Sequence, residues 1–114
     1  MNIHLIFLFI IISASIFEFF GDYNFKIFSR TNNYFNLSYG IIIYFLMFSI
    51  IIYALKFSNI IYMNTLWDST SIIIEFLFAY LLLGEKLSNL YQISGFIIIL
   101  IGIILFNIGK IPYK

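Results

Sequence analysis

Residues 3–28 of the chain read IHLIFLFIIISASIFEFFGDYNFKIF, and this stretch decides the fold. It is longer than the roughly 20 residues that an apolar helix needs to cross the hydrocarbon core of a bilayer. Its acidic and basic residues are Glu18, Asp22 and Lys26, all in the second half. The stretch therefore predicts a membrane-spanning helix that carries a carboxyl group within its apolar length.

Three further apolar stretches follow, separated by a polar loop at 31–36 and short turns at 56–59 and 84–86. Gly84 is placed to end the third helix, because glycine readily adopts the left-handed conformation of a helix C-cap. Pro112 follows the last stretch, where a helix should already have ended. We expect an all-α, four-helix transmembrane bundle that forms one domain over residues 1–114. The predicted helices span residues 3–28, 37–55, 60–83 and 87–109.

The composition agrees with a membrane protein. Hydrophobic residues make up 63% of the 114 residues and charged residues 10%, and the mean hydropathy is +1.06. A soluble domain of this size cannot bury so much apolar surface, whereas a lipid bilayer solvates it. We expect a multi-pass integral protein of a bacterial inner or plasma membrane, or of an organelle or viral membrane.

Several classes of function are not expected from this sequence. The net charge is +1 without a basic block, so nucleic acid is not an expected partner. The chain has no cysteine, and its one histidine, His4, has no companion ligands, so we expect neither a metal nor a cofactor. No nucleophile–base arrangement or phosphate-binding loop is present, and we therefore expect no enzyme.

Three acidic residues fall within the apolar spans of the predicted helices, namely Glu18, Asp68 and Glu75. An ionised side chain at the centre of a bilayer costs about 2.5–3.5 kcal/mol on insertion scales, and such residues are usually functional. On the first helix Ser15, Glu18 and Asp22 are three and four residues apart, so they share one face. Lys26 lies one turn beyond Asp22 and is placed to pair with it. We expect these acids to be protonated, to face a wet cavity or to bind a cation.

The third helix carries a polar stripe in which residues follow one another at steps of four, three and four. It is made by Asn64, Asp68, Ser71 and Glu75. A polar stripe in a membrane helix faces protein or water, where it either binds a ligand or joins helices by hydrogen bonds. For Asn64 and Ser71 we favour the helix-joining role, and Glu75 can equally be an interhelical or edge carboxyl group.

Aromatic rings and glycines complete the set of candidate residues. Tyr44 and Trp67, at the border of the stripe, can offer ring faces to a cation. Gly95, Gly102 and Gly109 recur every seven residues in the fourth helix. A stripe of small residues lets two helices approach closely, so we expect this face to be an association surface, unless the spacing arises by chance.

The basic residues give no preferred orientation in the membrane. With four spans, Lys56, Lys110 and Lys114 lie on one side and Lys26, Arg30 and Lys86 on the other. A chain without a bias under the positive-inside rule can insert both ways, and an antiparallel homodimer then follows. Chance can also produce such a balance among only six charges.

These residues together resemble the small multidrug resistance family, within the drug/metabolite transporter superfamily. The resemblance covers nearly the whole chain and depends on the order and spacing of its elements. The matching positions are Glu18, Gly21 and Lys26 in the first helix, Tyr44 in the second, Trp67 in the third, the turn Gly84-Glu85-Lys86-Leu87, and Gly95 and Gly102 in the fourth. Residues 81–105 are also similar to repeats of the broader superfamily.

The resemblance implies an antiparallel homodimer that exports small cationic compounds in exchange for protons. Glu18 from each protomer would meet in one chamber, where protons and a cationic substrate compete for the pair. The sequence departs from the family pattern at Asn64, where a tyrosine is usual, and at Asp22, where a small hydroxyl residue is common. Asp68 is a further acid that follows Trp67.

These departures leave other functions open. The same fold can carry a different cargo, such as a metabolite, a polyamine or a lipid-linked sugar, and a related partner subunit can replace the second copy. The chain can also be a structural membrane protein that does not transport. In each case the lipid bilayer is a partner.

Overall fold

The computed structural model describes the backbone of residues 3–109 and the side chains from Leu5 onward. Four helices in this part of the chain are long and apolar enough to cross a membrane, as in a multi-pass membrane protein. They are α1 (Ile3–Thr31), α2 (Tyr34–Ala54), α3 (Ile60–Phe78), which continues into the π-helical turn η1 (Ala79–Leu83), and α4 (Leu90–Ile108). The side chain of His4, and Lys110, Pro112 and Lys114, lie outside the described residues.

The turn between α1 and α2 is shorter than the loop predicted at 31–36. Thr31 still belongs to α1, and Asn32 alone adopts the left-handed conformation, with φ 54°. The side chain of Asn33 accepts a hydrogen bond from the Phe35 backbone N–H at 3.0 Å, which begins α2. Asparagine suits both roles, because it tolerates positive φ and caps helices well. Polar composition was therefore a poor guide to the length of this connection.

The connection between α3 and α4 is longer than predicted. Gly84 ends η1 in the left-handed conformation, φ 68°, which confirms its predicted role as a C-cap. The fourth helix begins at Leu90 instead of residue 87, because the Asn89 side chain accepts from the Gln92 N–H at 3.0 Å and caps the helix there. In turn the Gln92 side chain accepts from the Ser88 N–H at 2.7 Å. Residues 84–89 are therefore a non-helical segment.

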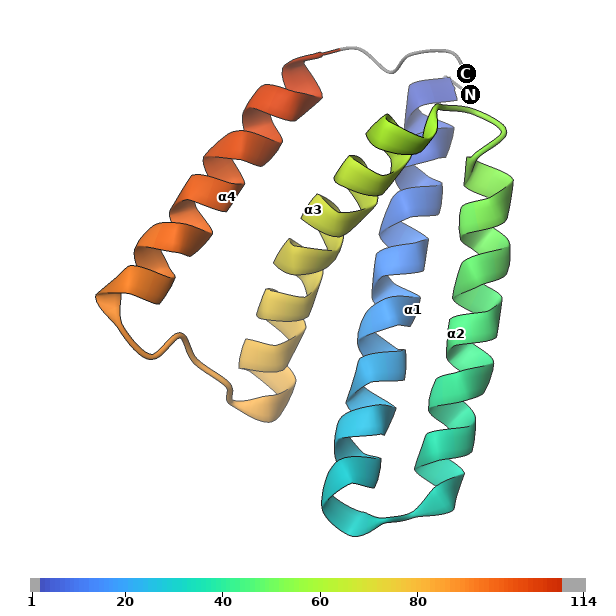
Figure 1. The fold of residues 1–114 in the computed structure, drawn as a ribbon, viewed down its shortest axis with the longest axis vertical. Helices are drawn as coiled ribbons and strands as arrows, with labels where there is room; N and C mark the ends of the chain where they lie inside the picture. Colours follow the sequence, from blue (N-terminus) through green and yellow to red (C-terminus); the bar gives the residue numbers. More distant parts are fainter. Residues whose placement is uncertain (1–2, 110–114) are drawn as a thin grey trace.

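The core lies where α1 packs between α2 and α3 (Figure 1). Its side chains are buried and apolar and come from all three helices. They are Phe7, Ile11 and Ala14 of α1, Met47, Ile51 and Ala54 of α2, and Tyr62, Met63 and Leu66 of α3. Burial of this set holds α1, α2 and α3 together as one unit.

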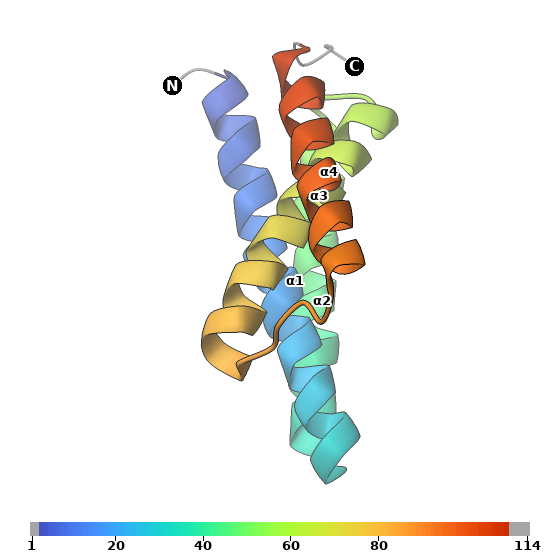
Figure 2. The same ribbon diagram turned by 90° about the vertical axis from the view of Figure 1, so that its left-hand side faces the viewer.

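Helix α4 stands outside this unit and lies beside α3 (Figures 1 and 2). None of its described residues is buried, and α3 is the only helix it packs against to any extent. Two aromatic pairs join them: the Tyr62 and Phe106 rings are 5.0 Å apart, and the Phe76 and Phe96 rings 4.5 Å apart. Most of the apolar surface of α4 therefore needs lipid or another protein surface to cover it.

The two ends of the fold hold different helix ends and turns (Figure 1). The start of α1, the end of α4 and the α2–α3 turn lie at one end, and the α1–α2 turn and the 84–89 segment lie at the other. With 29 residues, α1 is about 43 Å long at ~1.5 Å per residue, well beyond a hydrocarbon core of about 30 Å. Its last turns, which hold Lys26 and Arg30, can therefore reach the membrane–water boundary.

Candidate functional site

A serine pair sets how α1 and α3 cross. The Ser71 hydroxyl of α3 donates to the Ser15 hydroxyl of α1 at 3.1 Å, and Ser15 itself donates to the Ile11 carbonyl at 2.9 Å. Both serines are buried. Buried hydroxyl groups need such partners, and this bond brings the next turn of each helix into contact. Ser71 thus has the helix-joining role that the sequence favoured.

Three carboxyl groups meet one turn beyond the serine pair. One oxygen each from Glu18 and Asp22 of α1 and Glu75 of α3 lie within 4.8 Å of one another, and all three residues are half-buried. We call these three residues the carboxylate cluster. From the sequence Glu75 was expected to be an interhelical or edge carboxyl group, and its place beside Glu18 and Asp22 was not predicted. Glu75 lies four residues after Ser71 on the same face of α3, so its place follows only once the contact of Ser71 with α1 is known.

Negative charges on all three carboxyl groups of the cluster would repel one another strongly. Two unit charges 4.8 Å apart repel each other by about 3.5 kcal/mol at an effective dielectric constant of about 20. Three such pairs would outweigh most of the stability that a small helical unit has. Positive charge close to these carboxyl groups, such as a bound cation, would therefore be stabilised.

Tyr44 of α2 fixes one member of the cluster. Its hydroxyl group donates a hydrogen bond to Asp22 Oδ1, and its ring stacks on Phe25 at 5.4 Å. The ring lies directly against Gly21, where an added Cβ would come within 2.5 Å of it. Glycine at this position is therefore what allows Tyr44 to reach Asp22.

Two buried polar atoms of the predicted site residues have no hydrogen-bond partner among the described residues. They are the Glu18 Oε1 acceptor and the Trp67 Nε1 donor. An unpaired buried polar group costs about 1–3 kcal/mol, so each is a place where a proton, a water molecule or a ligand would be stabilised. Both residues were predicted as site residues from the sequence.

A cavity of about 380 Å³ opens beside the cluster. Asp22 and Glu75 belong to its wall, so two of the three carboxyl groups are accessible from it. Its volume is in the range of sites for small molecules. The remaining wall is mostly aromatic or aliphatic with a few charged groups: Phe19, Tyr23, Lys26, Phe76, Ala79, Leu83, Glu85, Lys86 and Leu87.

The polar stripe predicted on α3 divides into two parts. Ser71 and Glu75 lie against α1, whereas Asn64 and Asp68 are exposed on the surface of the single chain. Gly95 and Gly102 of α4 are exposed as well, and an added Cβ at either would meet no atom within 4 Å. Gly109 follows the end of α4 and is also exposed.

Lys26 does not have the partner that its spacing predicted. Its ammonium group forms an ion pair with Glu85 of the 84–89 segment and not with Asp22. The Tyr44 hydroxyl already occupies Asp22 Oδ1, and the lysine side chain is long enough to reach the neighbouring segment.

The carboxylate cluster can accept a cation, although a resident hard metal ion fits poorly. Ca²⁺ takes six to eight oxygen ligands, whereas the cluster offers one converging oxygen from each of three residues. Protons and organic ammonium ions need fewer ligands and suit the aromatic wall of the cavity.

No family model matches the sequence, and no curated protein or solved structure matches the chain.

Replacing Tyr44 by phenylalanine removes the donor to Asp22 while keeping the ring. We expect the free energy of unfolding in detergent to fall by about 1–3 kcal/mol, because a half-buried carboxyl group loses its hydrogen bond. Tyr39→Phe on the exposed side of α2 is the matched control and should have little effect. Equal stabilities of the two variants would show that the Tyr44–Asp22 bond does not support the site.

Proposed function

We propose that this chain is a proton-coupled exporter of small cationic compounds, of the small multidrug resistance type, embedded in a membrane. The observation that carries the proposal is the carboxylate cluster between α1 and α3, with the buried and unpaired Glu18 Oε1 in it. A cluster that favours positive charge can bind either protons or a cation. Competition between the two for the same oxygens is the basis of exchange.

The surroundings of the cluster suit an organic cation. Phe19, Tyr23 and Phe76 present rings to the cavity that Asp22 and Glu75 also line. Aromatic faces attract cations, and this attraction strengthens where water is excluded. A proton gradient would then drive export, because protonation of the cluster on one side of the membrane releases the cation there.

The second part of the proposal is an antiparallel homodimer. Asn64 and Asp68 are exposed on the single chain, although polar side chains in a membrane helix rarely face lipid. A second copy packed on this side would cover them, and α4, with its open stripe of Gly95 and Gly102, offers the surface for close helix contact. The equal distribution of basic residues allows both insertion directions.

A second candidate function keeps the fold and changes the cargo. The cluster has two carboxyl groups, Asp22 and Glu75, in addition to Glu18. This additional negative charge favours a more highly charged cation, such as a polyamine, over a monovalent drug. Competition between spermidine and tetraphenylphosphonium for binding would separate the two cargoes.

Replacing Glu18 by glutamine should abolish proton-driven transport. In vesicles that are acidic inside, we expect the wild-type chain to accumulate tetraphenylphosphonium and the Glu18→Gln variant to fall to the level of empty vesicles. The substitution keeps size and polarity but removes the proton-binding group. The dimer should persist in the variant, as measured by size-exclusion chromatography with light scattering. Undiminished uptake by Glu18→Gln would end the proposal.

Replacing Gly102 by leucine should weaken the dimer. The larger side chain would keep two α4 helices apart, whereas in the single chain it meets open space and leaves the fold intact. We expect at least a tenfold loss of dimer affinity in detergent, measured by energy transfer between labelled protomers. The neighbouring variant Ile101→Leu is the matched control. Equal affinities of both variants would place the interface elsewhere.

A further inference from the structure

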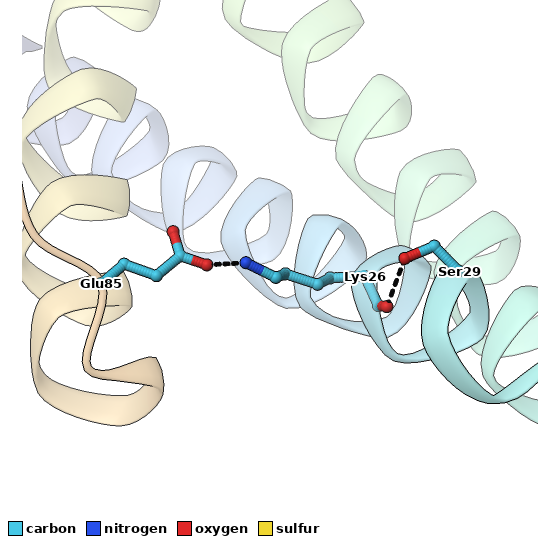
Figure 3. A network of polar contacts seen from close by, with 3 residues as sticks. All are labelled: Lys26, Ser29 and Glu85. Carbon is cyan, nitrogen blue, oxygen red and sulfur yellow. Dashed lines mark hydrogen bonds and ion pairs between the residues drawn. The ribbon is translucent and has the colours of Figure 1, made fainter.

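The 84–89 segment is attached to α1 by one ion pair. The Lys26 ammonium group and the Glu85 carboxylate make this contact, and it is the only salt bridge within residues 5–109 (Figure 3). The Ser29 hydroxyl donates to the Lys26 carbonyl at 2.6 Å and is drawn beside it. Helix α4, which the segment leads into, packs mainly on α3. The ion pair is therefore the specific link between α1 and the α3–α4 connection.

The ion pair lies at the outer part of the cavity wall. Lys26 and Glu85 line the same cavity as Asp22 and Glu75, and both are more than a third exposed, at 36% and 44% of their side chains. Asp22 is one helical turn further into the span than Lys26. A molecule that enters from the water on this side therefore meets the ion pair before it meets the carboxylate cluster.

The segment turns at Gly84, a residue that tolerates changes of backbone conformation. Gly84 adopts the left-handed conformation, and no atom lies within 4 Å of its would-be Cβ. The Glu85 N–H donates to the Ala79 carbonyl at 3.2 Å, so backbone hydrogen bonding and not side-chain packing holds this end of the segment. Lys26 also has a second partner available, because Asp22 is four residues before it on the same helix. Opening would thus exchange one carboxylate partner of Lys26 for another and leave the Glu85 carboxylate to the surrounding water.

We propose that the Lys26–Glu85 ion pair is a latch that holds the 84–89 segment over the mouth of the cavity and controls access to Asp22 and Glu75. Exposed ion pairs are weak and shift an equilibrium by a factor of up to about five. Such a latch biases the segment towards the closed position and still opens readily. The identity of the molecule that enters the open cavity rests on the proposed function. The latch itself depends only on the 84–89 segment and its ion pair.

The absence of cysteine from the chain gives a direct test. Ala79→Cys places a single thiol in the cavity wall, and its reaction rate with a bulky water-soluble maleimide in detergent reports access. We expect Lys26→Gln and Glu85→Gln each to raise the rate about two- to fivefold. The charge-swapped pair Lys26→Glu with Glu85→Lys should return the rate to that of the reference. Lys86→Gln, which lines the same cavity without an ion pair, is the matched control and should leave the rate unchanged.

Three results would overturn the latch. They are unchanged rates in both single variants, an equal acceleration by Lys86→Gln, and failure of the charge swap to restore the slow rate. Circular dichroism of each variant checks that the helices persist, and Leu83→Cys in the same wall is the second reporter if Ala79→Cys does not fold. The labelling uses neither substrate nor a proton gradient. A chain that fails to transport can therefore still show the latch, and one that transports can still lack it.

Discussion

Repulsion among the carboxyl groups of Glu18, Asp22 and Glu75 is the constraint on which the rest of the structure depends. An apolar helix bundle gains nothing from bringing three acids together, and at separations within 4.8 Å the repulsion is large. Protons on the carboxyl groups or a nearby cation would reduce this repulsion. The cluster is therefore the part of the fold on which the proposed exchange of protons for a cation depends.

The surrounding contacts keep the acids together in spite of this repulsion. The Ser71–Ser15 hydrogen bond fixes the crossing of α1 and α3 one turn away, and the Tyr44 hydroxyl restrains Asp22 from α2. Gly21 removes the side chain that would separate α1 from the Tyr44 ring. Helix α4 takes no part in this frame, and its uncovered surface leaves it free to serve contacts outside the single chain.

The sequence was informative where one physical requirement dominates and uninformative where packing decides. The four spans could be predicted, because the bilayer demands a run of apolar residues of a given length. The place of Glu75 could not, because it depends on how α3 is rotated about the Ser71 contact. The partner of Lys26 depends on the path of the 84–89 segment, in which Asn89 delays the start of α4 to Leu90. Helix periodicity in the sequence gives neither the place of Glu75 nor the partner of Lys26.

Proton release on cation binding tests the central claim most directly. Tetraphenylphosphonium is added to the purified protein in weakly buffered detergent solution, and the protons released per chain are compared with those from Glu18→Gln. If protons and the cation compete for the carboxylate cluster, the wild-type chain releases protons on binding and the variant releases none. Cation binding without any proton release from the wild type would contradict the claim.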